Sequence, residues 1–525
     1  MQALTGREEV TVDEALQRSV GEFGWGQRKL FLLVSLAGIP AGLQTMLLLF
    51  VGADPVRQHL WECTIAGDEQ CQREFGQTAP NLCSLPSASW RWTQRYDSVV
   101  SEWDLICGSA WAAQAINMAF FGGCLLGGLL LGAAANRFGR KTALFTSCLL
   151  MAFLGSLCSL APSFWWYVLL RSATGVGVGG LGRAAFLLAT EPIGPSWRGL
   201  AGLYTHAFFA MGAALAPLLA LLVPAWRPLT FLSAAATCLY LLFTPSIPES
   251  PRWLLAAGRK GEATSALAAI ASLNKTHLPE APLADPAFQI AQQRGLAEVL
   301  MHARLRRRLL VMLATCWTVV LAYTALTLSI NGLAGSPYLN QLLAFLVELP
   351  AISLAGLLLD RIGRRSTLMY SLLHGGLAAV LCALTRGWLQ RVCACACKFG
   401  VAAALCMTHT YTSELFPTTV RASALEAAML VAGMGSIMAP GLVLLAKFAE
   451  FVPFVACAVA LCLAGLSVMA LPETLGLPSA ETIQEMAAPT SRRFRLPGIR
   501  QILRLKSHSH TFFTRLADSD IESSQ

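Results

Sequence analysis

Long apolar runs dominate the pattern of hydrophobic and polar positions along the chain. Each spans about 18 to 25 residues, which is enough to cross a hydrocarbon core of about 30 Å as an α-helix. The runs lie at 30–51, 110–135, 143–160, 164–189, 199–223, 229–244, 309–332, 338–359, 367–385, 392–412, 422–446 and 451–471. They lack the alternation of a membrane barrel, and lipid requires backbone groups to be satisfied within each segment. The pattern predicts an all-α polytopic membrane protein with twelve transmembrane helices.

A repeated charged segment divides these helices into two sets of six. "GAAANRFGRK" at 132–141 and "GLLLDRIGRR" at 356–365 share their spacing and lie 224 residues apart. Two other features recur near this offset: a Pro-Glu pair follows the sixth and the twelfth run, and a Glu and an Arg seven residues apart follow the fourth and the tenth, at Glu191, Arg198, Glu414 and Arg421. The repeats predict a duplicated six-helix unit.

The basic residues give the expected orientation. With an inner N-terminus, the inner segments hold 28 of the 39 Lys and Arg residues, and such an excess marks the cytoplasmic side. We therefore expect, in order, a cytoplasmic segment 1–29, a first half 30–244 with an outer loop 52–109, a cytoplasmic linker 245–308, a second half 309–471 and a basic cytoplasmic tail 472–525. The net charge of +9 is then a topology signal and does not indicate nucleic acid binding.

Composition supports the membrane class and limits the chemistry. The chain is 55% apolar and only 13% charged, too apolar for one water-soluble core. Four of its 16 cysteines share the outer loop, Cys63, Cys71, Cys83 and Cys107. An even set in an oxidising compartment predicts two disulfides, with three pairings open. We find no nucleotide loop, metal-ligand spacing or nucleophile motif, so we expect no enzyme activity, metal or cofactor.

Finer motifs carry a family resemblance. These are "SEWDLIC" (101–107), "PESPRWLLAAGR" (248–259), "VELPA" (347–351) and "SELFPTTVR" (413–421), together with the repeated turns. Over residues 10–485 the chain resembles a divergent, orphan-like member of solute carrier family 22, the organic cation and anion transporters of the major facilitator superfamily. The resemblance implies alternating-access movement of organic ions across the plasma membrane, with the substrate site near the midplane between the halves.

Polar and aromatic residues within the runs are the candidate substrate contacts. Ionisable side chains inside a helical bundle are costly unless they are paired or wetted. Arg171 is a structural or a cavity residue, Arg183 is expected to extend towards the cytoplasm, and Glu348 to fix helix packing or a gate. Aromatic walls suit organic ions, and a histidine can sense protons or simply form hydrogen bonds. The candidate set is Lys398, Tyr323, Trp317, His409, Glu426, Gly433 and Arg171.

Gly433 bears on substrate charge. By the resemblance, it occupies the place where cation carriers have an acid and anion carriers have a base. With this acid missing and Lys398 within a span, we expect organic anions or zwitterions as substrates. The alternative is a carrier-shaped receptor or scaffold that does not transport. The sequence leaves the oligomeric state open.

The repeated turns and the Glu/Arg features predict a cytoplasmic gate or latch. Its candidate residues are Asn136, Arg137, Arg140, Glu191, Arg198, Asp360, Arg361, Arg364, Glu414 and Arg421. In relatives, the acid of the first turn helps to hold the halves together. Asn136 replaces that acid here while Asp360 keeps it, so we expect an asymmetric latch. The tail segment 492–506 is basic, which suggests either contact with anionic lipids or a disordered tail that carries trafficking signals.

Overall fold

A computed structural model describes residues 10–475 apart from 54, 57–59, 65–67, 76–81, 87, 94–96, 280, 285–295 and 448. Within this part of the chain, eleven helical segments are long and apolar enough to cross a membrane. The twelfth predicted run forms a shorter apolar helix, Val452–Val468. The predicted all-α polytopic fold is confirmed. The basic tail segment 492–506 lies outside the described residues.

The first half begins with a broken helix. Its pieces are α2 (Trp25–Ser35), α3 (Gly38–Met46) and α4 (Leu48–Val51). The break between α2 and α3 is explained by Pro40, which has no N–H for the carbonyl four residues earlier. The other five spans are α7 (Trp111–Phe138), α8 (Arg140–Cys158), α9 (Phe164–Thr190), α10 (Pro195–Leu222) and α11 (Trp226–Leu241).

The second half repeats this plan. Its first span is α16 (Ala303–Ile330), and its second is divided by Pro350 into α17 (Pro337–Leu346) and α18 (Glu348–Ile362). The remaining spans are α19 (Arg364–Leu384), α20 (Gly387–Leu415), α21 (Thr418–Leu444) and α22 (Val452–Val468). Pro217 within α10 and Pro440 within α21 lie at equivalent places, which adds a further feature to the repeat.

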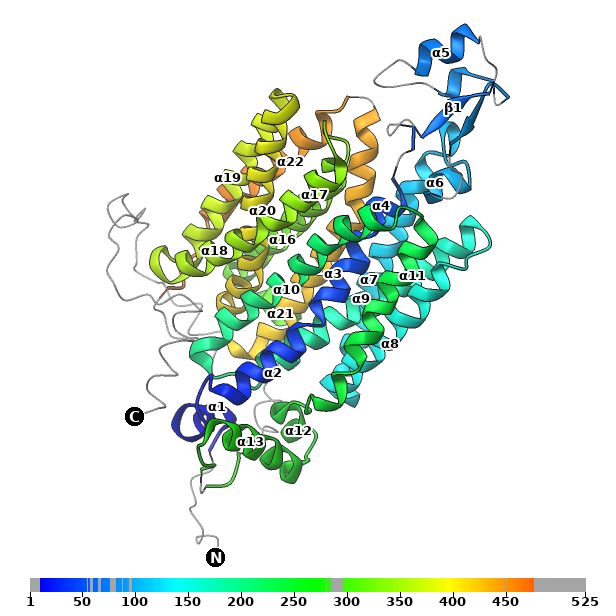
Figure 1. The fold of residues 1–525 in the computed structure, drawn as a ribbon. Coiled ribbons are helices and arrows are strands. Elements are labelled where there is room, and N and C mark those ends of the chain that lie inside the picture. Colours follow the sequence, from blue (N-terminus) through cyan, green and yellow to red (C-terminus); the bar gives the residue numbers. More distant parts are fainter. Residues whose placement is uncertain are drawn as a thin grey trace, which may run out of the picture.

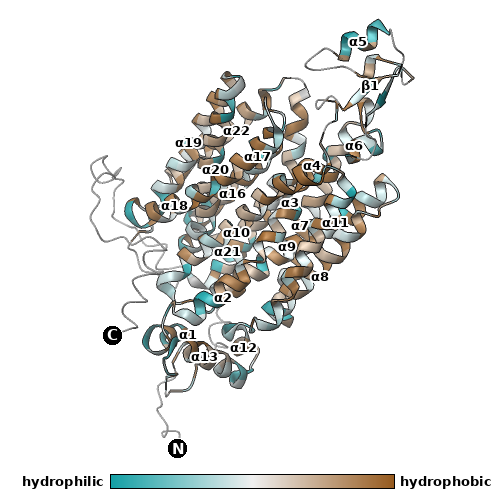
Figure 2. Cartoon of the chain, in the orientation of Figure 1, coloured by the Kyte–Doolittle hydropathy of each residue, from teal (hydrophilic) through white to brown (hydrophobic). Residues whose placement is uncertain are grey.

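The two halves lie side by side along the length of the bundle (Figure 1). Hydrophobic residues cover the middle of the helices, and hydrophilic residues gather towards their ends (Figure 2). One end carries the loop between α4 and α7, and we call it the loop end. The other end carries the two repeated turns, and we call it the turn end. These names are independent of which end faces the cytoplasm.

A small disulfide-bonded unit projects from the loop end (Figure 1). Its strands β1 (Trp61–Cys63) and β2 (Trp90–Trp92) pair in antiparallel register. Disulfides join Cys63 to Cys71 and Cys83 to Cys107. The short helices are α5 (Glu69–Phe75) and α6 (Val99–Glu102). The structure thus gives one of the three pairings that the sequence left open.

Short helices cover the turn end. They are α1 (Val12–Ala15), α12 (Pro251–Ala256), α13 (Lys260–Asn274) and α15 (Leu296–Met301). Asp13 of α1 accepts from Arg198 at 2.7 Å and also from Arg252, so the N-terminal segment is tied to the first half. Burial alone would raise the pKa of Asp13, but the neighbouring Arg252 and Arg198 guanidiniums hold it below its usual 3.8.

Asn274 ends α13 and fixes the approach to the first span. Its Oδ1 accepts from the backbone N–H of Gly26 at 2.8 Å, and its Nδ2 donates to the carbonyl of Val20 at 2.8 Å. A Cβ at Gly24 would lie 2.5 Å from the Asn274 side chain. Although Asn274 begins an Asn-x-Thr sequence, this side chain is therefore committed to structural contacts.

Candidate functional site

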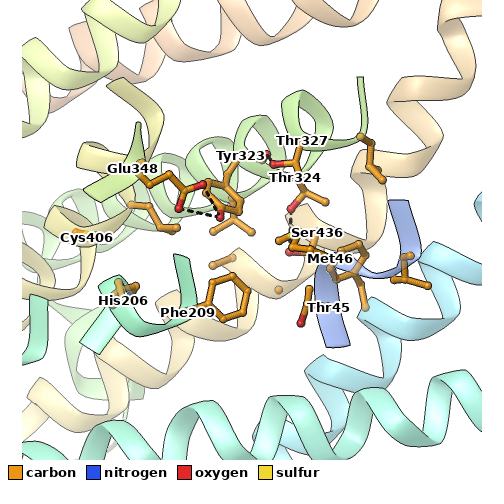
Figure 3. Close-up of a pocket in the computed structure, with 18 of the residues that line it drawn as sticks. Thr45, Met46, His206, Phe209, Tyr323, Thr324, Thr327, Glu348, Cys406 and Ser436 are labelled. Atoms are coloured by element: carbon orange, nitrogen blue, oxygen red, sulfur yellow. Dashed lines mark hydrogen bonds between the residues drawn. The ribbon is translucent and has the colours of Figure 1, made fainter. Parts of the chain in front are cut away.

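A cavity of about 310 Å³ lies between the two halves. The first half contributes residues of α3, α4, α7 and α10, and the second contributes residues of α16, α18, α20 and α21 (Figure 3). Most of the wall is apolar. The polar lining residues are Thr45, Asn117, His206, Tyr323, Thr324, Thr327, Glu348, His409 and Ser436. Such a mixture of apolar wall and a few polar groups is typical of small-molecule sites.

Glu348 is the only carboxylate among the described residues that line this cavity. It begins α18 just after the break at Val347, where the helix axis is interrupted. The hydroxyl of Tyr323 donates to Glu348 Oε1 at 3.0 Å (Figure 3). The sequence assigned Glu348 to packing or gating, whereas the structure places it on the cavity.

Lys398 lies directly behind Glu348. Its Nζ is 3.1 Å from Glu348 Oε1, and the two side chains are 0% and 5% exposed respectively. The same Nζ donates to Thr327 Oγ1 at 2.5 Å and lies 3.3 Å from the centre of the Tyr323 ring. The cluster therefore satisfies a buried cation with a carboxylate, a hydroxyl and an aromatic face. Lys398 reaches the cavity through these partners and is not itself among the lining residues.

The aromatic candidates on α16 divide into one inside and one outside the cavity. Tyr323 lines it, together with Val320, Thr324 and Thr327, which share one helix face. Trp317 lies almost one turn before Val320 and is not among the lining residues. Its carbonyl faces α21, where a Cβ added at Gly435 would meet it at 2.6 Å. Trp317, a candidate for the cavity wall, thus lies about one helical turn outside it.

Two histidines from opposite halves meet at the cavity. His206 of α10 and His409 of α20 both line it, and their ring centroids are 5.5 Å apart. The His409 ring also contacts Phe186 edge to face at 6.5 Å. Sequence reasoning identified His409 but missed His206. The sequence did carry a signal for His206, because a polar ring inside an otherwise apolar run is a candidate functional residue.

Gly433 lines the cavity on α21, as expected, but its surroundings are full. A Cβ at this position would lie 2.7 Å from the Cδ1 of Leu125, a residue of α7 in the other half. The space next to Gly433 is thus taken by an apolar side chain. This contact adds to the close packing of α7 against α21.

Arg171 serves the packing of the first half. It is fully buried and donates to the side-chain oxygen of Gln44 at 2.9 Å and to the Gln44 carbonyl at 2.6 Å. Its guanidinium lies 4.8 Å from the centre of the Phe120 ring. It joins α9 to α3 and α7 and does not line the cavity, in agreement with the structural alternative.

Glu426 and Arg183 face each other from opposite halves, outside the cavity. Their charges are close enough to interact, and the charge of Arg183 also reaches His409. The guanidinium of Arg183 lies along the helix face that carries Gly128 and Gly132. Glu426 is therefore not a lining residue and interacts with Arg183 only at longer range, which differs from its expected role as a substrate contact.

The first repeated turn is held by charged residues of its own half. Gly139 has φ +110°, and a Cβ there would lie 2.2 Å from a Glu249 carboxylate oxygen. The Arg140 backbone N–H donates to Glu249 at 3.0 Å, and its side chain pairs with Glu191 at 3.1 Å. Glu191 thus pairs with Arg140, whereas Arg198 pairs with Asp13.

The second turn has the same design. Gly363 has φ +96°, and the Arg364 backbone N–H donates to Glu473 at 2.8 Å. The Arg364 side chain pairs with Glu414 at 3.0 Å. Arg421 donates to the carbonyl of Phe416 at 3.4 Å. The matched contacts explain why Gly, Arg and Glu recur at the same spacing in both halves.

The proposed latch positions make their contacts within their own halves. The carbonyl of Asn136 accepts from Trp253 Nε1 at 2.8 Å. Asp360 is 55% exposed and pairs with Arg364 at 3.4 Å. Arg137 and Arg361 are exposed. Among the described residues, neither Asn136 nor Asp360 bridges the halves in this conformation, so an asymmetric latch stays a prediction.

Contacts between the halves lie on both sides of the cavity. Towards the loop end, Asn331 donates to the carbonyl of Leu49 at 2.8 Å, and the Phe50 and Tyr338 rings stack at 5.5 Å. Towards the turn end, the halves share a buried apolar cluster, Leu203, Ile352 and Cys406. Alternating access requires one set to open while the other stays closed.

The comparisons with known proteins fit this geometry. The sugar (and other) transporter family matches residues 85–487, more than half of the chain. "Solute carrier family 22 member 15" of Xenopus tropicalis is 30% identical, with 97% of each chain covered. The chain belongs to solute carrier family 22 of the major facilitator superfamily. The predicted family is confirmed, and the protein is a transporter-family member and not an enzyme.

Other relatives of this family 22 protein carry names that specify substrates. "Organic cation/carnitine transporter 4" of Arabidopsis thaliana is 34% identical over 498 residues, with 91% of each chain covered. The proton:xylose symporter XylE has the same fold, with a TM-score of 0.62 at 18% identity and with 88% of this chain and 98% of XylE covered. Within the described residues, no group of three or more His, Cys, Asp or Glu is arranged to hold a metal ion.

Proposed function

We propose that this family 22 protein moves a small organic zwitterion across the plasma membrane by alternating access, with the turn end in the cytoplasm. The observation that carries the proposal is the Glu348–Lys398 pair at the cavity wall, with its two charges 3.1 Å apart. A solute with both signs of charge can exchange with such a pair without leaving either charge alone. A buried charge without a partner costs several kcal/mol.

The charges around the cavity favour a zwitterion over a simple anion or cation. Glu348 carries the only formal charge among the described lining residues, apart from the histidines. Lys398 and Arg171, the two cations that favoured anions in the sequence, are both occupied by partners. A net anion would therefore meet a carboxylate and no available cation on the wall. A net cation would add a second positive charge beside Lys398 and bring no negative charge of its own to offset it.

The orientation follows from the excess of basic residues and from the disulfides. The linker and the repeated turns are basic, which suits the cytoplasmic side. The loop end carries two disulfides, which suit an oxidising exterior. Both features favour a turn end that faces the cytoplasm. Labelling of an engineered cysteine in each end, in intact and in permeabilised cells, tests this assignment.

Uptake into proteoliposomes tests the substrate class. Purified protein is compared with empty vesicles for two zwitterions, carnitine and 6-aminohexanoate, for the cation tetraethylammonium and for the anion hippurate. We expect saturable zwitterion uptake that exceeds uptake of either simple ion by about tenfold, the effect of about 1.4 kcal/mol. Glu348→Gln should abolish the preference. His374→Gln is the matched control, because His374 contacts Phe399 and lies away from the lining residues.

Two outcomes would contradict the proposal. Preferred uptake of hippurate would show that the paired charges do not exclude anions. Absence of uptake for all four solutes, with folded protein verified by its thermal transition, would favour the alternative of a carrier-shaped receptor or scaffold. The filled space beside Gly433 would support this alternative, because an apolar side chain occupies the position where relatives carry a charge.

A further inference from the structure

The His206–His409 pair has chemistry that the Glu348–Lys398 cluster does not use. Both rings line the cavity, they come from opposite halves, and their centroids are 5.5 Å apart. The Nδ1 atom of His206 is buried without a hydrogen-bond partner of good geometry in the described residues, although the ring approaches the backbone of Gly202 and Leu203 in its own helix. Buried polar atoms are usually satisfied, so an imidazole with only such weak contacts beside a cavity is a candidate ligand contact.

The surroundings of the pair favour an anionic ligand group. Arg183 of α9 places its positive charge within reach of His409. Among the described residues, Arg183 makes no ion pair, and Glu426 interacts with it only at longer range. The remaining neighbours of the rings are apolar or weakly polar, including Phe186 and Cys406. Two imidazoles from facing helices can each donate one N–H to the two oxygens of a carboxylate.

Helix geometry relates this pair to Glu348. Glu348 lies one turn, about 6 Å, from Ile352 along α18. Ile352 packs with Leu203 and Cys406 in one buried cluster. Leu203 and Cys406 are each three residues, or about 4.5 Å, from one of the two histidines along their helices. The imidazole pair and Glu348 are therefore connected through one buried cluster but occupy separate places on the cavity wall.

We propose that His206 and His409 form a carboxylate-binding subsite, so that the solute is an elongated ω-amino carboxylate with its ammonium at Glu348. This inference rests on the proposed function and adds the second contact and a preference for solute length. The two subsites occupy separate places on one cavity wall, so a chain must join the ammonium to the carboxylate. The apolar wall between them suits the methylene chain.

The site also explains how a solute can act on both halves. Glu348 and His409 belong to the second half, and His206 belongs to the first. A carboxylate between the two imidazoles adds a bond across the interface that the empty cavity lacks. Binding therefore stabilises the conformation in which the rings are close, which is the differential affinity that a solute needs to shift a conformational equilibrium.

A chain-length series tests the inference in full-length protein. Uptake and binding are measured for ω-amino carboxylates from three to ten carbons, with binding followed by the rise in thermal transition. We expect binding to rise at least tenfold from the three-carbon compound to an optimum within the series and to fall beyond it. His206→Leu and His409→Leu should each weaken the best compound about tenfold or more, the range for a hydrogen bond to a charged group. They should also remove the length preference.

Conservative variants and a control separate a ligand contact from a packing role. His206→Gln and His409→Gln keep a donor and should recover part of the lost affinity, whereas His374→Leu should leave the length preference unchanged. Equal uptake at all lengths, with the histidine variants unaffected, overturns the carboxylate subsite and leaves the proposed function standing. Uptake of no zwitterion at any length overturns the proposed function itself.

Discussion

The Glu348–Lys398 pair permits a quantitative prediction about stability. Both side chains are buried, and the ammonium lies 3.1 Å from the carboxylate. Replacing Lys398 by Met removes the cation and leaves the carboxylate with the Tyr323 hydroxyl as its hydrogen-bond donor. Breaking a buried pair in this way costs about 3 to 5 kcal/mol. Glu348→Gln leaves the ammonium with the Thr327 hydroxyl and the Tyr323 ring but without a counter-charge, and should cost a similar amount.

The double variant Glu348→Gln with Lys398→Met should recover much of this loss. Neither isolated charge remains, and a neutral pair of similar volume is often tolerated. We therefore expect a coupling energy of at least about 2 kcal/mol between the two sites. Purified variants are compared by thermal and denaturant unfolding in one detergent. Thr327→Val is a matched comparison that keeps both charges: it removes the hydroxyl's bonds to Lys398 and to the Tyr323 carbonyl and should cost about 2 kcal/mol, less than either charge variant.

The reasoning would be refuted by additive effects. If the double variant lost the sum of the two single losses within about 0.5 kcal/mol, the two charges would not depend on each other. Losses below about 1 kcal/mol in both single variants would contradict burial of a coupled pair.

Three further predictions concern the turn, the outer loop and the filled space beside Gly433. Gly139→Ala should destabilise the protein by about 1 to 3 kcal/mol in thermal unfolding, because φ +110° disfavours any side chain. Cys83→Ser should reduce surface biotinylation, because the chain-entropy value of closing a loop of 24 residues is about 3 kcal/mol. Gly433→Asp should add tetraethylammonium uptake, provided that Leu125 rotates away from the 2.7 Å contact.

Each of these predictions has its own check. Gly182→Ala is the control for Gly139, since no atom lies within 4 Å of an added Cβ at Gly182; equal stability of both variants would contradict the turn account. Cys238→Ser controls for the loss of a thiol, because Cys238 is free and exposed. Normal surface delivery of Cys83→Ser would show that the outer loop folds without its disulfide. Unchanged cation exclusion in Gly433→Asp would separate Gly433 from substrate charge.

The fold was predictable because its signals are local and repeated. Each apolar run is long enough to define a helix on its own, and the turns need glycine at the positive φ of Gly139 and Gly363. The breaks in the first and eighth spans follow from Pro40 and Pro350. The pairing of the four loop cysteines was not predictable, because it depends on how the loop folds back on itself.

The site was predictable one helix at a time but not across helices. Lys398 stood out as a cation within an apolar run, yet its partner Glu348 lies 50 residues earlier on another helix. Trp317 was placed one turn too far into the cavity, since a run gives the helix but not the depth at which the cavity ends. His206 meets His409 only because the two halves pack together, and no pattern within α10 reports that contact.

The repeated charges show the same limit. Glu191 and Arg198 recur together in the sequence, but Glu191 pairs with Arg140 and Arg198 pairs with Asp13. Seven residues span about two turns, and here Gly194 and Pro195 interrupt the helix between the two. The recurring spacing therefore marks the repeat but does not reveal the ion pairs, because the two residues belong to separate ones.

The central claim is that a zwitterion crosses by alternating access at the cavity between the halves, and counterflow tests it most directly. Proteoliposomes are loaded with unlabelled 6-aminohexanoate and diluted into a trace of the labelled compound. The account predicts a transient accumulation of label above equilibrium that is lost in Glu348→Gln and kept in His374→Gln. Accumulation requires a carrier whose site returns loaded from the other side. Label that only equilibrates, or that never enters, would contradict the account.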